Sequence, residues 1–213
     1  MTILNHQETI EGMKSIPDWT HHANSLTRTY KFETFLLGIA FVRRIAKRAE
    51  KLQHHPDNQH LEAAEGWLGL GNWREANDEL ENIRPELRDH PFVLEVRYKI
   101  FAEAKRWDEA VEIARTLSEM LPDNSWGFIH YAYSLHELKR TREAYGVLIP
   151  VVDKFSEPTI RYNLACYSCQ LGHLKEAMLW LGKAIDLAGR KDIRQMALAD
   201  PDLKPLWPKI EEI

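Results

Sequence analysis

LGNWREA at residues 70–76 recurs along the chain in altered form, as AKRWDEA at 104–110, LKRTREA at 138–144 and LGHLKEA at 171–177. The alanines that close the four segments are 34, 34 and 33 residues apart. A seven-residue pattern that returns four times at a nearly constant interval indicates an internal repeat. Because each repeat then stacks on the next one, this spacing decides the class of fold.

Each period holds two runs of apolar residues with helical spacing. In the second period, Phe92, Val96 and Ile100 recur at intervals of four. The second run of that period consists of Trp107, Ala110, Val111, Ala114 and Leu117. Apolar residues at such intervals lie on one face of an α-helix. Pro122 then closes the unit, since proline cannot continue a helix. The pattern predicts pairs of amphipathic helices.

These features resemble the tetratricopeptide repeat family, which has a 34-residue period and small residues at fixed places. The small residue midway in the first helix is Ala64, Ala132 or Ala165, whereas Tyr98 stands there in the second repeat, so the packing must differ at that place. The resemblance covers about residues 57–190. It implies a mainly α fold with four helix pairs in a right-handed superhelix.

Residues 191–213 follow the fourth repeat. A repeat array needs a terminal unit that covers its last apolar face. We therefore expect a capping helix and a turn, and the apolar residues suited to cover that face are Met196, Leu198, Leu203, Leu206 and Trp207.

Residues 1–56 lack the repeat, and their pattern predicts a separate small α/β segment. A short helix is expected over residues 5–15. Alternation of side chains over residues 19–32 indicates a β-hairpin with its turn at 21–25. The apolar residues of 35–52 have the spacing of a long amphipathic helix, which ends before Pro56 because proline disfavours helical geometry in the preceding residue.

Several short motifs of this segment keep a fixed order. They are Trp19, LTRTYKFETF at 26–35, AFV at 40–42, AEK at 49–51 and HHPD at 54–57. Their order and spacing resemble the first half of pterin-4a-carbinolamine dehydratase over residues 16–57. That family continues with two more strands, a third histidine and a last helix, and here the repeat begins instead.

His54 and His55 are the candidate catalytic residues. In the family that the segment resembles, such histidines act as general acid and base when the carbinolamine loses its 4a-hydroxyl group. Imidazole suits this chemistry because its ordinary pKa of about 6.5 lies near physiological pH. The alternative is that the pair ends a helix and caps its carbonyl groups, which the missing third histidine favours. Whether the chain is an enzyme stays open, and the more economical hypothesis is that it is not.

The overall composition is that of a soluble globular protein. Hydrophobic residues make up 44%, and 28 basic against 32 acidic residues give a net charge of −4. This balance lacks the basic excess of nucleic-acid-binding proteins. The N-terminus has no apolar stretch typical of a signal peptide, and no run of ~18 apolar residues predicts a membrane span. We expect a cytoplasmic protein that binds neither nucleic acid nor membrane.

Cys166 and Cys169 form a C-x-x-C pattern inside a predicted helix. A structural zinc site needs four ligands, and no suitable further pair lies at the usual spacing. A redox site of this type sits at a helix N-terminus, whereas this motif lies in the middle of a helix. We interpret the two thiols as packed side chains and predict no metal and no cofactor.

The first helices of a tetratricopeptide superhelix line its concave side. By this resemblance, the candidate partner-binding residues are Phe92, Glu95, Lys99, Trp126, Ile129, Tyr133, His136, Tyr162, Asn163 and Cys166. Exposed aromatic side chains on a concave surface are the usual anchors of a bound peptide or helix. The alternative is that some of them pack against neighbouring repeats. Since Lys99 is the only basic residue among them, ligands that end in an acidic carboxylate tail are not expected to bind.

The primary hypothesis is therefore a protein-interaction scaffold that binds a peptide or a helix in its concave groove. A second hypothesis is a 4a-hydroxytetrahydrobiopterin dehydratase that gains its missing parts from oligomerisation or from the repeats. A third makes residues 1–56 an oligomerisation device, because Phe35, Ile39 and Val42 offer an apolar stripe.

Overall fold

The computed structural model describes residues 20–22, 25–27 and 56–212. In its N-terminal part, strands β1 (Thr20–His22) and β2 (Ser25–Thr27) pair antiparallel, with Thr20 opposite Thr27. The expected hairpin is present, but its turn is shorter than predicted, since residues 21 and 22 belong to β1. The helices expected over residues 5–15 and 35–52 lie outside the described residues.

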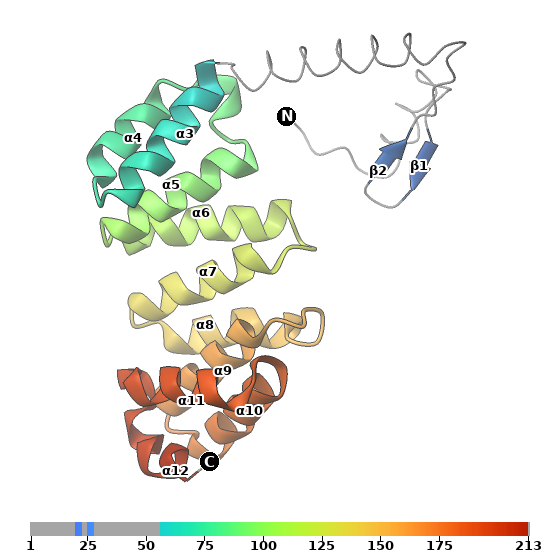
Figure 1. The fold of residues 1–213 in the computed structure, drawn as a ribbon, viewed down its shortest axis with the longest axis vertical. Coiled ribbons are helices and arrows are strands. Elements are labelled where there is room, and N and C mark those ends of the chain that lie inside the picture. The colour runs from blue at the N-terminus through green and yellow to red at the C-terminus, as the bar shows by residue number, and fades with distance from the viewer. Residues whose placement is uncertain (1–19, 23–24, 28–55, 213) are drawn as a thin grey trace.

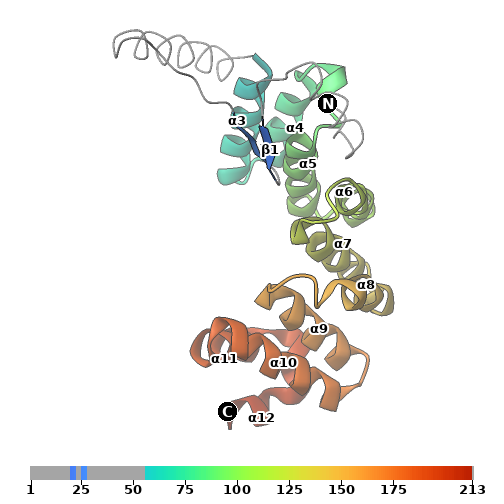
Figure 2. The same cartoon turned by 90° about the vertical axis from the view of Figure 1, so that its right-hand side faces the viewer.

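Ten α-helices and three short 3-10 segments follow in the described part of the chain (Figure 1). Their bounds are α3 Pro56–Gly69, α4 Trp73–Glu81, η1 Pro85–Leu87, α5 Pro91–Glu103, α6 Trp107–Met120, α7 Ser125–Glu137, α8 Thr141–Leu148, η2 Ile149–Val151, α9 Pro158–Gln170, α10 Leu174–Ala188, α11 Arg190–Ala199, η3 Pro201–Leu206 and α12 Trp207–Glu211. Helices α3 to α10 form four successive antiparallel pairs that stack along the molecule (Figures 1 and 2). The predicted mainly α fold of four tetratricopeptide-like pairs with a C-terminal cap is confirmed.

The four turns inside the helix pairs share one backbone geometry. In each turn, one amide donates to the carbonyl three residues earlier and the next amide donates to the carbonyl five residues earlier, at 2.8–3.0 Å. This is the Schellman closure of a helix, which needs a residue in the left-handed conformation. The residues with positive φ are Gly71 (73°), Lys105 (56°), Lys139 (63°) and Gly172 (82°). Two of the four turns therefore place a lysine where glycine is preferred.

Alanines hold the two helices of each pair close together. The closing alanines of the four segments, Ala76, Ala110, Ala144 and Ala177, are fully buried. So are the small residues of the first helices, Ala64, Ala132 and Ala165. Tyr98 replaces the small residue in α5 and is buried as well, with its ring edge-on against Trp126 of α7 at 5.1 Å. The predicted difference in packing is thus a tyrosine that reaches from α5 to the next repeat.

The cap covers the last repeat as predicted, except that one of the expected residues, Met196, lies on the outer side. Leu203 and Leu206 are fully buried, and the Trp207 indole donates to the Ala197 carbonyl at 3.0 Å. Met196, which we expected to cover the repeat, is 45% exposed instead. Because α11 starts at Arg190, its buried face carries Ile193 and Ala197, and Met196 falls on the outer side.

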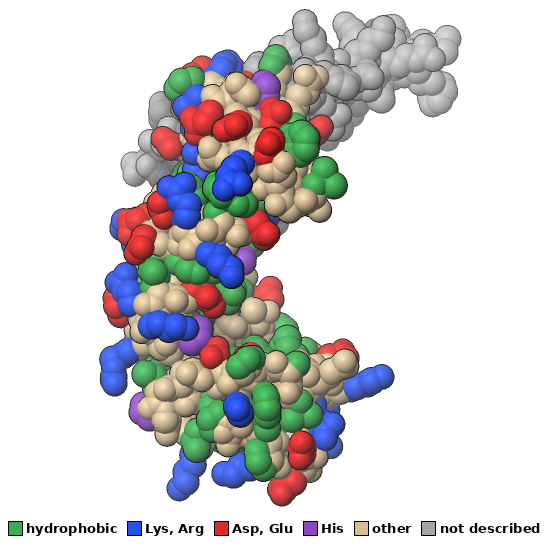
Figure 3. Space-filling model, turned by 90° about the vertical axis from the view of Figure 1, so that its left-hand side faces the viewer, with side chains coloured by type: hydrophobic (Ala, Val, Ile, Leu, Met, Phe, Trp, Pro, Cys, Tyr) green, Lys and Arg blue, Asp and Glu red, His purple; other side chains and the backbone are tan. Residues whose placement is uncertain are grey.

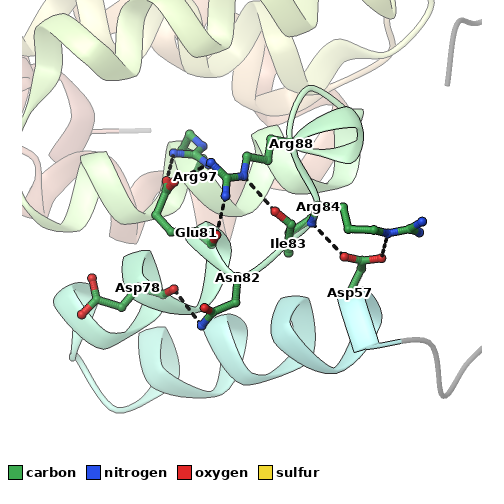
Figure 4. A network of polar contacts seen from close by, with 8 residues as sticks. All are labelled: Asp57, Asp78, Glu81, Asn82, Ile83, Arg84, Arg88 and Arg97. Atoms are coloured by element: carbon green, nitrogen blue, oxygen red, sulfur yellow. Dashed lines mark hydrogen bonds and ion pairs between the residues drawn. The ribbon is translucent and has the colours of Figure 1, made fainter.

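The N-terminal end of the array is fixed by ion pairs (Figure 4). The carboxylate of Asp57, in the first turn of α3, accepts hydrogen bonds from the Arg84 backbone amide (2.9 Å) and from its Nε (2.7 Å). Glu81 at the end of α4 accepts from Arg88 (2.8 Å) and from Arg97 of α5 (3.0 Å). These contacts tie α3, α4 and α5 together. In residues 20–22, 25–27 and 56–212, no helix combines the length and the apolar character that a membrane crossing requires.

Candidate binding groove

A groove follows the first helices of the central repeats. Figure 3 shows the array curving so that its middle is set back from its two ends. Side chains of α5, α6, α7 and α9 surround a cavity of about 540 Å³, which we call the central pocket. Four of the predicted partner-binding residues line it, namely Lys99, Ile129, Tyr133 and Asn163.

The wall of the central pocket is largely aromatic, because Tyr98, Trp107, His130 and Tyr133 all line it. The Tyr98 ring lies 4.7 Å from the His130 ring, and its hydroxyl is 3.1 Å from the Ser134 hydroxyl. Burial raises the pKa of Tyr98 to about 12. Burial, together with the charge of Lys99, lowers the pKa of His130 to about 4. His130 is therefore neutral at physiological pH and contributes an uncharged ring to the pocket.

A second cavity of about 360 Å³ continues the groove toward the C-terminus, and we call it the C-terminal pocket. Tyr133 and Asn163 line both pockets, so the two are adjacent parts of one groove. Its remaining walls come from α7, from α9 and from residues 200–202 of the cap. The cap therefore does more than cover the last repeat, because it forms one side of the groove.

Carboxylates of the cap are fixed by hydrogen bonds to α7 and α9. Asp200 Oδ2 accepts from the Tyr162 hydroxyl at 2.8 Å and from the Cys166 thiol at 3.4 Å. Asp202 Oδ2 lies 2.7 Å from His136 Nε2. The opposite ring nitrogen of His136 lies 2.9 Å from the Thr141 hydroxyl. This network holds the two aspartates in fixed positions at the edge of the C-terminal pocket.

The cap changes the exposure of three predicted residues. We expected His136, Tyr162 and Cys166 to be exposed in the groove, but they are 7%, 6% and 4% exposed. The reason is that the segment with Asp200 and Asp202 folds back over α7 and α9 and covers them. They line the C-terminal pocket, and their role in binding a partner stays a prediction.

The three other predicted residues lie outside both pockets. Phe92, at the start of α5, is 63% exposed and lines a separate cavity of about 190 Å³ beside α3 and η1. Glu95 is half-buried, and this burial raises its pKa despite the nearby charge of Lys99. Trp126 is half-buried with its ring 4.0 Å from the ring of His130. Trp126 thus packs against His130, which lines the central pocket, without lining the pocket itself.

The acidic residues of the C-terminal pocket, Glu137, Asp200 and Asp202, were missed by the sequence analysis. Glu137 is four residues after Tyr133 on α7, so the helical spacing between the two was a usable signal that both lie on the same side of the helix. Asp200 and Asp202 carry no such signal, because they belong to the cap and reach the groove only through the fold. Among the residues that the structure describes, none of these three carboxylates has a lysine or arginine within 4.0 Å.

The two thiols are buried, as packed side chains are. Burial is the main cause that raises the pKa values of Cys166 and Cys169, and the neighbouring Asp200 carboxylate adds to the effect on Cys166. A thiol with a raised pKa stays protonated and is a poor nucleophile. Within the described part of the chain, no three His, Cys, Asp or Glu side chains come together in a way that could hold a metal ion. The candidate catalytic residues His54 and His55 lie outside the described residues.

The fold is a helical-repeat architecture with tetratricopeptide-like helix pairs. Solved structures of similar fold include MamA 41-end from Desulfovibrio magneticus RS-1, with a TM-score of 0.58, 17% identity and coverage of 75% of this chain and 96% of that chain. MamA MSR-1 C2 has a TM-score of 0.55 and 21% identity, over 63% of this chain and 78% of that chain. At these identities the likeness concerns the fold. No tetratricopeptide family model matches the sequence.

The N-terminal segment is similar to a different class of protein. The family model of pterin 4 alpha carbinolamine dehydratase matches residues 2–65. A putative pterin-4-alpha-carbinolamine dehydratase from Mycolicibacterium smegmatis is 42% identical over 57 residues, which are 27% of this chain and 61% of the relative. One from Mycobacterium tuberculosis is 39% identical over the same share of each chain. The chain thus spans about three fifths of the length of these curated relatives.

Proposed function

We propose that the repeat array is a protein-interaction scaffold that binds a peptide or a helix of a partner protein in the groove. The observation that carries this proposal is Tyr133, which is 41% exposed where the central and C-terminal pockets meet. Its ring packs edge-on against Trp107 at 5.6 Å, so it is held in place before a ligand arrives. A fixed aromatic side chain beside a cavity is a typical anchor of protein recognition, because little entropy is lost on binding.

The test is a selection of phage-displayed random dodecapeptides on the immobilised full chain. Peptides that occupy the groove should lose at least tenfold in affinity for the Tyr133→Ala variant, since truncation of an anchor residue typically costs ~2 kcal/mol or more. The matched control is Leu179→Ala in α10, an apolar residue that is 68% exposed and outside both pockets. Equal binding to wild type and to Tyr133→Ala, measured by fluorescence anisotropy, would contradict the proposal.

A second proposal is 4a-hydroxytetrahydrobiopterin dehydratase activity in the N-terminal segment. It is supported by the family match over residues 2–65, within which His54 and His55 lie. Activity would require the parts of the site that the matched relatives carry beyond this segment, supplied by a second copy or by the repeats. We also propose that the chain divides into residues 1–56, 57–190 and 191–213, because the repeat spacing covers only the middle range.

A stopped-flow assay of carbinolamine dehydration by the purified protein tests this second proposal. The expected result is turnover that His54→Ala and His55→Ala abolish. His60→Ala is the matched control, because His60 on α3 is hydrogen-bonded to Glu79 at 2.7 Å and has no proposed catalytic part. A rate equal to the uncatalysed one would leave residues 1–56 as an oligomerisation device. Light scattering of the full chain and of residues 57–213 tests the oligomerisation role. An oligomeric state that does not change when residues 1–56 are removed rules this role out.

A further inference from the structure

The C-terminal pocket differs in chemistry from the rest of the groove. Three carboxylates border it, those of Glu137, Asp200 and Asp202, and its lining contains no lysine or arginine. The central pocket, in contrast, combines Lys99 with Glu103 and is otherwise mostly apolar. The groove therefore has an apolar middle and an acidic end.

Tyrosines complete the walls of this acidic end. Tyr133, Tyr162 and Tyr167 all line the C-terminal pocket. Tyr167 is 2% exposed, and its hydroxyl has no hydrogen-bond partner among the described residues. A buried hydroxyl without a partner is uncommon, because leaving it unsatisfied costs about 1–3 kcal/mol. Because that oxygen is enclosed by the protein, Tyr167 contributes its ring and not its hydroxyl to the wall of the pocket.

From this geometry we infer that the C-terminal pocket binds a lysine or arginine side chain of the partner peptide whose apolar residue occupies the central pocket. This inference rests on the proposed function and adds the chemistry of the ligand. The aspartates meet a cation without rearranging, because Tyr162, Cys166 and His136 already hold them. A cation in this pocket is stabilised by cation–π attraction to the tyrosine rings and by charge-assisted hydrogen bonds to the fixed carboxylates.

The fold also sets the distance between the two anchors of the peptide. Ile129 lines the central pocket and Glu137 the C-terminal pocket, and both belong to α7. Eight residues at a rise of 1.5 Å place them ~12 Å apart. An extended peptide advances ~3.3 Å per residue, so the basic residue lies about three to four positions from the apolar anchor.

The experiment compares dodecapeptide pools selected on the wild-type full chain and on Glu137→Gln. We expect lysine or arginine to be enriched about three to four positions from an aromatic or large apolar residue in the wild-type pool, and not in the other pool. In the best synthetic peptide, replacement of the basic residue by norleucine should weaken binding to wild type at least tenfold. The same replacement should change binding to Glu137→Gln less than threefold.

The control variant is Glu103→Gln, which removes a carboxylate from the central pocket and should keep the full tenfold effect of norleucine. Norleucine substitution in the peptide needs no protein variant, so the inference is tested even if Glu137→Gln does not fold. Tyr133-dependent peptides whose affinity is indifferent to charge would overturn the inference and leave the proposed function intact. If no selected peptide loses affinity in the Tyr133→Ala variant, both the inference and the proposed function are wrong.

A second copy of the chain is the competing occupant, since residues 43–51 carry five basic side chains. Light scattering of the wild type and Glu137→Gln without peptide tests it. An oligomer that the Glu137→Gln variant dissociates would mean that the pocket serves self-association, and the inferred peptide ligand would be wrong. An identical mass for both proteins supports the peptide ligand.

Discussion

Glycine in place of Lys105 or Lys139 should stabilise the repeat array. Both lysines have positive φ, 56° and 63°, in turns whose equivalents in the first and fourth repeats are Gly71 and Gly172. For a residue with a Cβ atom, the left-handed conformation costs about 1–2 kcal/mol, because Cβ approaches the following carbonyl oxygen. Both lysine side chains are exposed, and the described residues offer them no hydrogen bond or ion pair that the substitution would remove.

The expected gain is the difference of two opposing terms. Glycine relieves the backbone strain of about 1–2 kcal/mol but loses ~0.5–1 kcal/mol more conformational entropy on folding. The free energy of unfolding should therefore rise by about 0.5–1 kcal/mol for each single variant. Because the two turns belong to different repeats, the effects should add to about 1–2 kcal/mol in Lys105→Gly/Lys139→Gly.

Urea unfolding followed by circular dichroism measures this change, with native-state hydrogen exchange of α5 to α8 as a local readout. Exchange is needed because repeat arrays can unfold in parts. Lys105→Ala is the matched control, since it removes the lysine side chain and keeps the Cβ atom. A Lys105→Gly protein no more stable than Lys105→Ala would refute the reasoning from backbone strain. The reverse change, Gly172→Lys, should destabilise the last pair by a similar amount.

Further changes test the packing of α7 and α8 and the titration of His130. Gly127→Ala should cost about 1–3 kcal/mol of stability in thermal unfolding, because its Cβ would lie 2.5 Å from the backbone nitrogen of Ser118. Gly146→Ala in α8, where a Cβ meets nothing within 4 Å, should instead add ~0.5–1 kcal/mol, and equal effects would contradict this account. His130, with a pKa lowered from 6.5 to about 4, takes up a proton on unfolding between these values, so stability should fall as the pH drops from 6.5 to 4. The loss should be about 1–3 kcal/mol, and it should shrink in His130→Phe when urea unfolding is repeated across this pH range.

Local spacing was sufficient to predict the repeat and its helix pairs. The period of 34 residues and the alanines at fixed places translate directly into buried contacts, as the full burial of Ala76 and Ala144 illustrates. The positive φ of Lys105 could not be predicted from the residue type, because lysine is not typical of a left-handed turn. Only alignment with Gly71 and Gly172 in the equivalent segments points to it.

The groove was predictable only where it depends on one helix. Ile129 and Tyr133 were predicted from the resemblance of α7 to the first helix of a tetratricopeptide repeat, and both line the central pocket. His136 and Tyr162 lie on the expected helices, but the cap buries them. The position of Asp200 depends on how η3 folds back over α9, a contact between residues 38 positions apart with no periodic signal.

The two similarities of this chain overlap in residues 56–65, and the structure shows how the repeat uses them. The family model of the dehydratase extends to residue 65, whereas α3 already begins at Pro56. Proline suits the first position of a helix, where its missing N–H is not needed. Asp57 then bonds to Arg84, and the fully buried Ala64 lies in the core with Ala76 and Leu80 of α4. Because these side chains already serve the first repeat, catalysis by His54 and His55 would need groups from elsewhere, and the two proposed activities can fail independently.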